Sequence, residues 1–96
     1  MKIAIFPGSF DPFTKGHADI VLRGLALFDK IVVGIGINNQ KHSLFSAQER
    51  KQTIERLFAD NNRVEVKTYD CLTVDFARQE GAQFILRGVR SMVDFE

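Results

Sequence analysis

The chain has 96 residues and a nearly balanced charge, with 13 Lys and Arg against 12 Asp and Glu for a net charge of +1. Its composition, 45% hydrophobic and 26% charged, is typical of one soluble globular domain. The balance argues against a nucleic-acid binder that relies on a broad basic face. The single cysteine, Cys71, excludes an internal disulfide and an all-cysteine metal site, and it fits a reducing compartment.

No stretch has the composition of a targeting or membrane segment. The apolar run at residues 1–6 is broken by Pro7-Gly8 and is too short for a signal-peptide core. The longest later apolar run, residues 31–37, is far shorter than the roughly 18 residues that a membrane helix needs. We therefore expect a cytoplasmic protein without a membrane partner.

The first predicted elements are a strand and a helix. Residues 2–6 are apolar and rich in β-forming side chains, which predicts a buried strand. Residues 16–28 have apolar side chains at helical spacing. The residues expected to face the core are Ala18, Val21, Leu22, Leu25 and Phe28. Ile20 and Leu27 widen this apolar face, which suggests a second contact, for instance with another subunit.

A second strand and helix follow. Residues 30–37 are apolar throughout, which predicts a strand covered on both faces. After a polar loop, Ser46-Ala47-Gln48-Glu49 predicts a capping box, in which the first and last residues exchange side-chain and backbone hydrogen bonds. The helix that it begins extends to about residue 59, with Ile54, Leu57 and Phe58 facing inward.

The last third of the chain continues the alternation. Residues 63–69 alternate apolar and polar positions and predict a third strand. A helix is expected at residues 73–80, ended by Gly81 in the left-handed conformation, and a fourth strand at 83–87. Residues 91–94 resemble the first turn of another helix.

This alternation predicts an α/β fold, with a Rossmann-like parallel sheet, right-handed crossovers and helices on both faces. Residues 1–96 contain no repeat or linker and form one domain. In such sheets, ligands bind beyond the carboxyl ends of the strands. Functional residues are therefore expected just after Phe6, Ile37, Tyr69 and Leu86.

The segment after the first strand favours phosphate binding. Gly8 allows a ligand to approach the backbone, and Gly16-His17 begins a helix whose free amides and dipole attract phosphate. His17 can donate to a phosphate oxygen there. A lone histidine would be interpreted as a surface residue, but Gly8, Ser9 and the Thr14-Lys15-Gly16-His17 string favour a binding loop together.

Other phosphate-binding motifs are absent from the sequence. No P-loop string occurs, and Gly34-Ile35-Gly36 lies within a strand without the third glycine of a dinucleotide fingerprint. We interpret these glycines as positions of close packing. Arg87-Gly88-Val89-Arg90, after the fourth strand, presents two guanidinium groups that can bind phosphate oxygens. Lys41, after the second strand, could add a cation at the same edge.

The string from Pro7 to His17 resembles the T-x-G-H form of the nucleotidyltransferase signature. With Lys41 and residues 87–96, which read R-G-V-R-S-M-V-D-F-E, the whole chain resembles the bacterial phosphopantetheine adenylyltransferases. That resemblance implies transfer of the adenylyl group of ATP to 4′-phosphopantetheine, which gives dephospho-coenzyme A and pyrophosphate in coenzyme A biosynthesis. It also implies Mg²⁺, a homohexamer and feedback by coenzyme A, with no residue assigned as a metal ligand.

The resemblance further implies residue roles. His17 would hold the α-phosphate, Ser9 would lie near both substrates, and the Leu72 backbone would follow the pantetheine arm. The implied catalytic residues are His17, Lys41 and Arg90. The implied ATP-binding residues are Ser9, Phe10, His17, Gly88, Val89 and Arg90. The implied acceptor-binding residues are Ser9, Lys41, Leu72, Thr73 and Arg87.

The implied reaction fits the side chains present, because the acceptor phosphate is the nucleophile and no activated side chain is needed. The family continues past the D-F-E string with another strand and a serine-rich helix start, so we expect the C-terminal part of this fold to be missing. If the molecule ends at Glu96, we expect weak ATP binding and little turnover.

Two alternatives stay open. The first motif alone marks a wider superfamily, so the chain could be a nicotinamide-nucleotide adenylyltransferase or a cytidylyltransferase, which assays with different acceptors would separate. The second alternative is a nucleotide-binding module without catalysis, in which replacing His17 by alanine would leave every activity unchanged.

Overall fold

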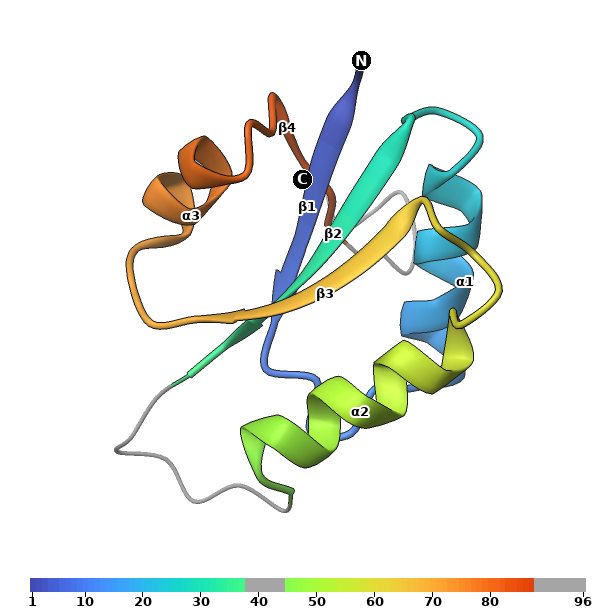
Figure 1. The fold of residues 1–96 in the computed structure, drawn as a ribbon, viewed down its shortest axis with the longest axis vertical. Helices are drawn as coiled ribbons and strands as arrows, with labels where there is room; N and C mark the ends of the chain where they lie inside the picture. The colour runs from blue at the N-terminus through green and yellow to red at the C-terminus, as the bar shows by residue number, and fades with distance from the viewer. Residues whose placement is uncertain (38–44, 88–96) are drawn as a thin grey trace, which may run out of the picture.

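The computed structural model describes residues 1–37 and 45–87. Its elements are β1 (Ile3–Gly8), α1 (Lys15–Gly24), β2 (Lys30–Gly36), α2 (Ala47–Leu57), β3 (Val64–Tyr69), α3 (Thr73–Gln79) and β4 (Phe84–Ile85). The strands pair in parallel in the order β3-β2-β1-β4. Figure 1 shows α1 and α2 on one face of this sheet and α3 on the other. The predicted Rossmann-like α/β arrangement is confirmed.

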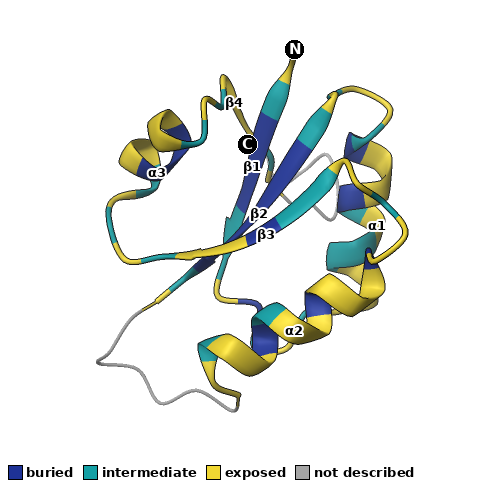
Figure 2. Cartoon of the chain, in the orientation of Figure 1, coloured by how far each residue is buried: buried dark blue, intermediate teal, exposed yellow. Residues whose placement is uncertain are grey.

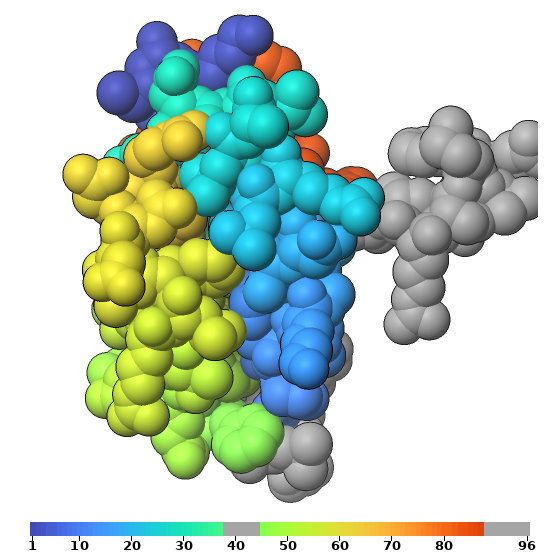
Figure 3. Space-filling model, turned by 90° about the vertical axis from the view of Figure 1, so that its right-hand side faces the viewer, coloured from blue at the N-terminus to red at the C-terminus, as the bar shows by residue number. Residues whose placement is uncertain are grey.

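The sheet separates two apolar clusters, because successive side chains of a strand point to opposite faces. On β2, Ile31, Val33 and Ile35 pack toward α1 and α2, whereas Val32 packs toward α3. Buried residues concentrate on the central strands β1 and β2 (Figure 2). Figure 3 shows α1 and α2 side by side on one face of the molecule, and both contribute side chains to the larger cluster. The prediction that β2 is covered on both faces is confirmed.

Two glycine predictions are confirmed. A Cβ atom at Gly34 would lie 2.5 Å from Cε2 of Phe76 and 3.0 Å from Cε1 of Tyr69, so this glycine permits α3 to pack closely on the sheet. The prediction of close packing is wrong at Gly36, where the nearest side-chain atom, Oη of Tyr69, would be 3.6 Å away, which is ordinary contact. Gly81 has φ +70° and follows α3 as predicted.

α1 is shorter than predicted and ends at Gly24 instead of residue 28. The guanidinium of Arg63, just before β3, donates to the backbone carbonyls of Leu25, Phe28 and Asp29. These bonds satisfy the carbonyl of the C-cap residue Leu25 and two carbonyls of the segment after it, and they stabilise a turn in place of a further helical turn. No local sequence pattern indicates this contact, because it joins residues that are far apart in the chain.

Some predicted core positions are wrong. Leu22 and Leu57 are 56% and 57% exposed, because the buried stripe of each helix runs through Val21 and Ile54 and leaves these leucines at its margin. Ile20 packs against the larger cluster, while Leu27 is 68% exposed. The helix predicted to begin at residue 91 lies outside the described residues. No helix in the described part of the chain is long and apolar enough to cross a membrane.

Candidate active site

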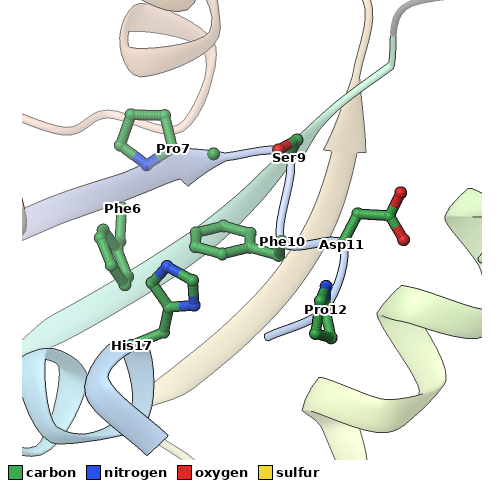
Figure 4. Close-up of a pocket in the computed structure, with 8 residues that line it drawn as sticks. Phe6, Pro7, Ser9, Phe10, Asp11, Pro12 and His17 are labelled. Atoms are coloured by element: carbon green, nitrogen blue, oxygen red, sulfur yellow. The ribbon is translucent and has the colours of Figure 1, made fainter. Parts of the chain in front are cut away.

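An open pocket of about 470 Å³ lies at the carboxyl end of β1, where the sequence predicts a ligand. Its lining residues are Phe6, Pro7, Gly8, Ser9, Phe10, Asp11, Pro12 and His17. All of them except His17 belong to one continuous segment, and His17 comes from the first turn of α1. Figure 4 shows the imidazole of His17 between Phe6 and Phe10, with the carboxylate of Asp11 pointing away from it.

The Thr14–His17 string begins α1 with a pair of reciprocal hydrogen bonds. Oγ1 of Thr14 accepts from the backbone amide of His17 at 3.3 Å, and the amide of Thr14 donates to Nδ1 of His17 at 2.9 Å. This is a capping box in which histidine takes the place of the usual Glu or Gln. The sequence predicts the box at Ser46 but not this one, although the four-residue spacing was visible.

The hydrogen bond from the Thr14 amide to Nδ1 determines which tautomer the imidazole of His17 adopts. Because Nδ1 accepts a hydrogen bond from the Thr14 amide, the neutral ring carries its proton on Nε2. Partial burial lowers the pKa of His17 from its ordinary value of 6.5. His17 is therefore a neutral ring at neutral pH, with its Nε2–H as the donor left for a ligand.

Aromatic side chains hold the ring of His17 in place. Its centroid lies 5.0 Å from that of Phe10, in an edge-to-face arrangement, and 5.3 Å from that of Phe13. The ring of Phe6 is 6.1 Å away. These neighbours also remove water from one side of the imidazole, which is the cause of its lowered pKa.

Phe10 occupies an unusual backbone conformation, with φ +49°. The residue is 4% exposed, and its ring packs over Gly8, where an added Cβ atom would lie 2.8 Å from Cζ of Phe10. Gly8 is therefore required for the close approach of this ring. Because the ring packs in the core, it is not free to stack on a nucleotide base, although Phe10 lines the pocket.

Two residues that the sequence analysis did not single out for this role attach the binding loop to α2. Arg50 of α2 donates from Nη1 to the carbonyl of Ser9 at 2.5 Å. Oδ1 of Asp11 accepts from the amide of Phe45, next to the N-cap residue of α2, at 3.0 Å. Both contacts cross more than thirty residues of sequence, so neither leaves a local pattern.

The remaining predicted site residues are only partly described. Leu72 and Thr73 follow β3, and Arg87 lies just past β4, so all three are at the carboxyl edge of the sheet. Leu72 and Arg87 are exposed, and Oγ1 of Thr73 lies 3.0 Å from Oη of Tyr69. None of these three is among the described residues that line the pocket. The predicted residues Lys41, Gly88, Val89 and Arg90 lie outside the described residues.

The described residues offer little for a metal ion by themselves. Within residues 1–37 and 45–87, no three His, Cys, Asp or Glu side chains are grouped to hold one. Mg²⁺ in phosphate-transfer sites is bound largely by substrate phosphates and water, with one or two carboxylates from the protein. Asp11, the carboxylate among the lining residues, points away from His17 and accepts from the Phe45 amide, so a metal ion here would be held mainly by the phosphates of a nucleotide.

Known proteins resemble the chain in both sequence and fold. Over all 96 residues, it is 56% identical to the phosphopantetheine adenylyltransferase of Phocaeicola vulgatus and 53% identical to that of Bacteroides thetaiotaomicron. A crystal structure of a bifunctional NMN adenylyltransferase/ADP ribose pyrophosphatase from Francisella tularensis, complexed with AMP and a manganese ion, superimposes with a TM-score of 0.63. That match has 26% sequence identity and covers 82% of this chain and 25% of the other.

The parallel sheet and the T-x-G-H loop are those of the nucleotidyltransferase class, as the resemblance to this class predicts. Residues 5–96 match the model of the cytidylyltransferase-like family, and the chain belongs to that family. The aligned region spans 64% of the length of the two phosphopantetheine adenylyltransferases.

Proposed function

We propose that the protein transfers the adenylyl group of ATP to 4′-phosphopantetheine and produces dephospho-coenzyme A and pyrophosphate. The observation that carries this proposal is the Nε2–H of His17, which Thr14 orients at a pocket beside Ser9. The choice of acceptor is supported by the relatives that are 56% and 53% identical to the chain and have this activity in their names.

In the proposed reaction, an oxygen of the acceptor phosphate attacks the α-phosphorus of ATP. The new O–P bond forms as the bond from the α-phosphorus to the bridging oxygen breaks, and pyrophosphate leaves with that electron pair. The second pKa of a phosphate monoester is about 6, so the nucleophile is already ionised at neutral pH. The neutral His17 donates from Nε2 to a non-bridging α-phosphate oxygen and stabilises the charge that develops there.

We assign the other residues supporting roles in the same reaction. Ser9 and the backbone of Phe10 would bind ATP, with Ser9 also near the acceptor phosphate. Arg87 and Lys41 would hold that phosphate, and Thr73 with the Leu72 backbone would follow the pantetheine arm. The residues proposed to contact the nucleotide after β4 are Gly88, Val89 and Arg90, with Arg90 acting on the transferred group. The position of Leu72, Thr73 and Arg87 at the carboxyl edge of the sheet supports these assignments.

Mg²⁺ would be bound by the phosphates of ATP and by water, and when bound it would neutralise phosphate charge. A cytoplasmic homohexamer is also proposed from the resemblance. The exposed leucines Leu22, Leu27 and Leu57 on α1, the turn after it and α2 support a contact between subunits. Coenzyme A contains the pantetheine arm of the acceptor, so feedback binding would use the same edge of the sheet.

The test measures pyrophosphate release by the native protein from ATP, with Mg²⁺ and one acceptor at a time. The acceptors are 4′-phosphopantetheine, nicotinamide mononucleotide and glycerol phosphate, and CTP replaces ATP in a parallel series. We expect turnover with ATP and 4′-phosphopantetheine to exceed the others by about 100-fold or more, because a site built for polar groups rejects acceptors that leave them unpaired. Preferred turnover with another acceptor would contradict the proposal, and no turnover at all would favour the binding module.

A further inference from the structure

Arg50 is the buried charged residue in the described part of the chain, with 7% of its surface exposed. It lies one helical turn after Ser46, the N-cap residue of α2. Its Nε donates to the carbonyl of Ser46 at 3.3 Å, and its Nη1 donates to the carbonyl of Ser9 at 2.5 Å. The guanidinium therefore joins the start of α2 directly to the loop after β1.

Stability alone does not explain a charge at this position. Removing a guanidinium from water costs free energy that hydrogen bonds and an ion partner must offset. The salt bridges among the described residues join other side chains, and none includes Arg50. An apolar residue of similar length, such as methionine, would fill the same space without that cost. Methionine could supply neither guanidinium bond, but the Ser46 carbonyl would still accept from the backbone amide of residue 50, so the bond to Ser9 is the one without a substitute.

That bond sets the direction of the next peptide group. In a trans peptide the carbonyl and the following amide point in opposite directions, and the Ser9–Phe10 bond is trans. Because the Ser9 carbonyl points to Arg50, the Phe10 amide points away from α2. This amide has no hydrogen-bond acceptor among residues 1–37 and 45–87.

Arg50 is not one of the residues that line the pocket. Arg50 lines a small separate cavity of about 90 Å³ that shares Phe10 and Pro12 with the pocket. On the other side of Phe10, Asp11 is tied to α2 through the amide of Phe45. Phe10 is therefore held between two attachments to the start of α2, which fits its left-handed backbone.

We propose that Arg50 is a positioning residue for nucleotide transfer. It fixes the Ser9–Phe10 peptide group so that the Phe10 amide donates to a phosphate oxygen of the nucleotide in the pocket. Its buried positive charge, poorly screened by water, adds attraction for the same phosphate. This inference rests on the proposed function for the identity of the phosphate, but the orientation of the amide is independent of it.

The test compares Arg50→Met, Arg50→Lys and the matched control Arg56→Met, an exposed arginine on the same helix. All three are made in the native protein and assayed at a temperature where thermal unfolding shows them folded. We expect kcat/KM for ATP to fall about 100-fold in Arg50→Met, because a small displacement of a positioning group has that effect. The kcat/KM of Arg50→Lys should be about ten-fold higher than that of Arg50→Met. Lysine keeps the positive charge but lacks the several fixed N–H donors of the guanidinium group. Arg56→Met should match the wild type.

A direct measurement accompanies the kinetics and does not depend on turnover. Addition of ATP to the wild type should shift the ¹H–¹⁵N resonance of the Phe10 amide strongly, and the shift should be reduced in Arg50→Lys. A folded Arg50→Met with wild-type kcat/KM would overturn the inference and leave the proposed function intact. If Arg50→Met does not fold, an unshifted Phe10 amide in an ATP-saturated wild type would overturn it. A shifted amide in a protein without adenylyl transfer would instead support Arg50 while the proposed function fails.

Discussion

The starts of α1 and α2 are built alike but serve different purposes. Both helices begin with a capping box, from Thr14 to His17 on α1 and from Ser46 to Glu49 on α2. Glu49 is exposed and only completes the hydrogen bonds of its own helix. His17 completes the same bonds through Nδ1 and keeps Nε2–H for the pocket. One local motif therefore produces a structural cap in one place and a candidate catalytic group in the other.

The two boxes also respond differently to protons. Hydrogen bonds from the Ser46 backbone and side chain lower the pKa of Glu49 from 4.5, so that cap is strongest when the residue is charged. Partial burial lowers the pKa of His17 from 6.5, so that cap is strongest when the residue is neutral. Neutral histidine at this position has a donor on one nitrogen and an acceptor on the other, which glutamate does not have.

The largest effect on turnover should come from replacing His17 by glutamate, the residue that Glu49 provides at the same position of the capping box of α2. In His17→Glu, the carboxylate can still accept from the Thr14 amide, so we expect the free energy of unfolding to change by less than about 1 kcal/mol. Turnover should fall by about 100-fold or more, because the Nε2–H donor is lost and a negative charge faces the phosphates. Thermal unfolding and pyrophosphate release measure the two effects separately.

The matched control for this substitution is Glu49→Gln, which changes the corresponding residue of α2 and keeps the cap. It should leave turnover at the wild-type value. A His17→Glu protein that is folded and turns over at a rate close to that of the wild type would show that the histidine acts only as a cap.

Removing the hydroxyl of each N-cap residue should have a smaller effect that again differs between the helices. Thr14→Ala and Ser46→Ala should each lower the free energy of unfolding by about 1 kcal/mol, the usual contribution of an N-cap side chain. Only Thr14→Ala should also lower kcat, because Oγ1 of Thr14 lies 3.1 Å from Nδ1 of His17 and the ring loses this contact. Thr14→Ser should restore both values. Equal loss of kcat in the two alanine variants would contradict the distinction between the boxes.

The outcome at these boxes shows what a single sequence can and cannot predict. The Ser46 box, the strands and the break at Gly81 were predictable because each depends on neighbours within a few residues. The two residues of the box at Thr14 are just as close in sequence as those of the Ser46 box. Histidine is not the usual partner in a capping box, however, so the sequence predicts only a phosphate-binding loop there. The attachment of Ser9 to Arg50 joins residues 41 positions apart, which no local pattern indicates.

The sequence also could not predict which residues at the margin of each helix are buried. Helical periodicity identifies an apolar stripe, but the neighbouring element decides its edges, so Leu22 and Leu57 were wrongly placed in the core. The early end of α1 depends on Arg63, which reaches back from the start of β3. The class of the fold was predictable because it depends on the order of elements, whereas these details depend on contacts between them.

The smallest effect should be on the pH dependence of stability, which should differ between the two capping boxes. A base whose pKa is lower in the folded state binds more protons when unfolded, so stability rises with pH across that interval. The contribution of His17 is therefore complete above its unfolded value of 6.5 and is lost as the pH falls below it toward the folded pKa. For Glu49, the lowered pKa gives a contribution that is present above 4.5 and is lost only at lower pH.

Urea unfolding at a series of pH values measures this difference. His17→Gln keeps a capping side chain but does not titrate, so it should remove the loss of stability that begins below pH 6.5. Glu49→Gln should leave that loss in place and remove only the one below pH 4.5. Because each comparison subtracts the wild-type curve, contributions that the variant and the wild type share cancel. A His17→Gln curve parallel to that of the wild type between pH 6.5 and 4.5 would mean that the imidazole binds its proton equally well in the folded and unfolded chain.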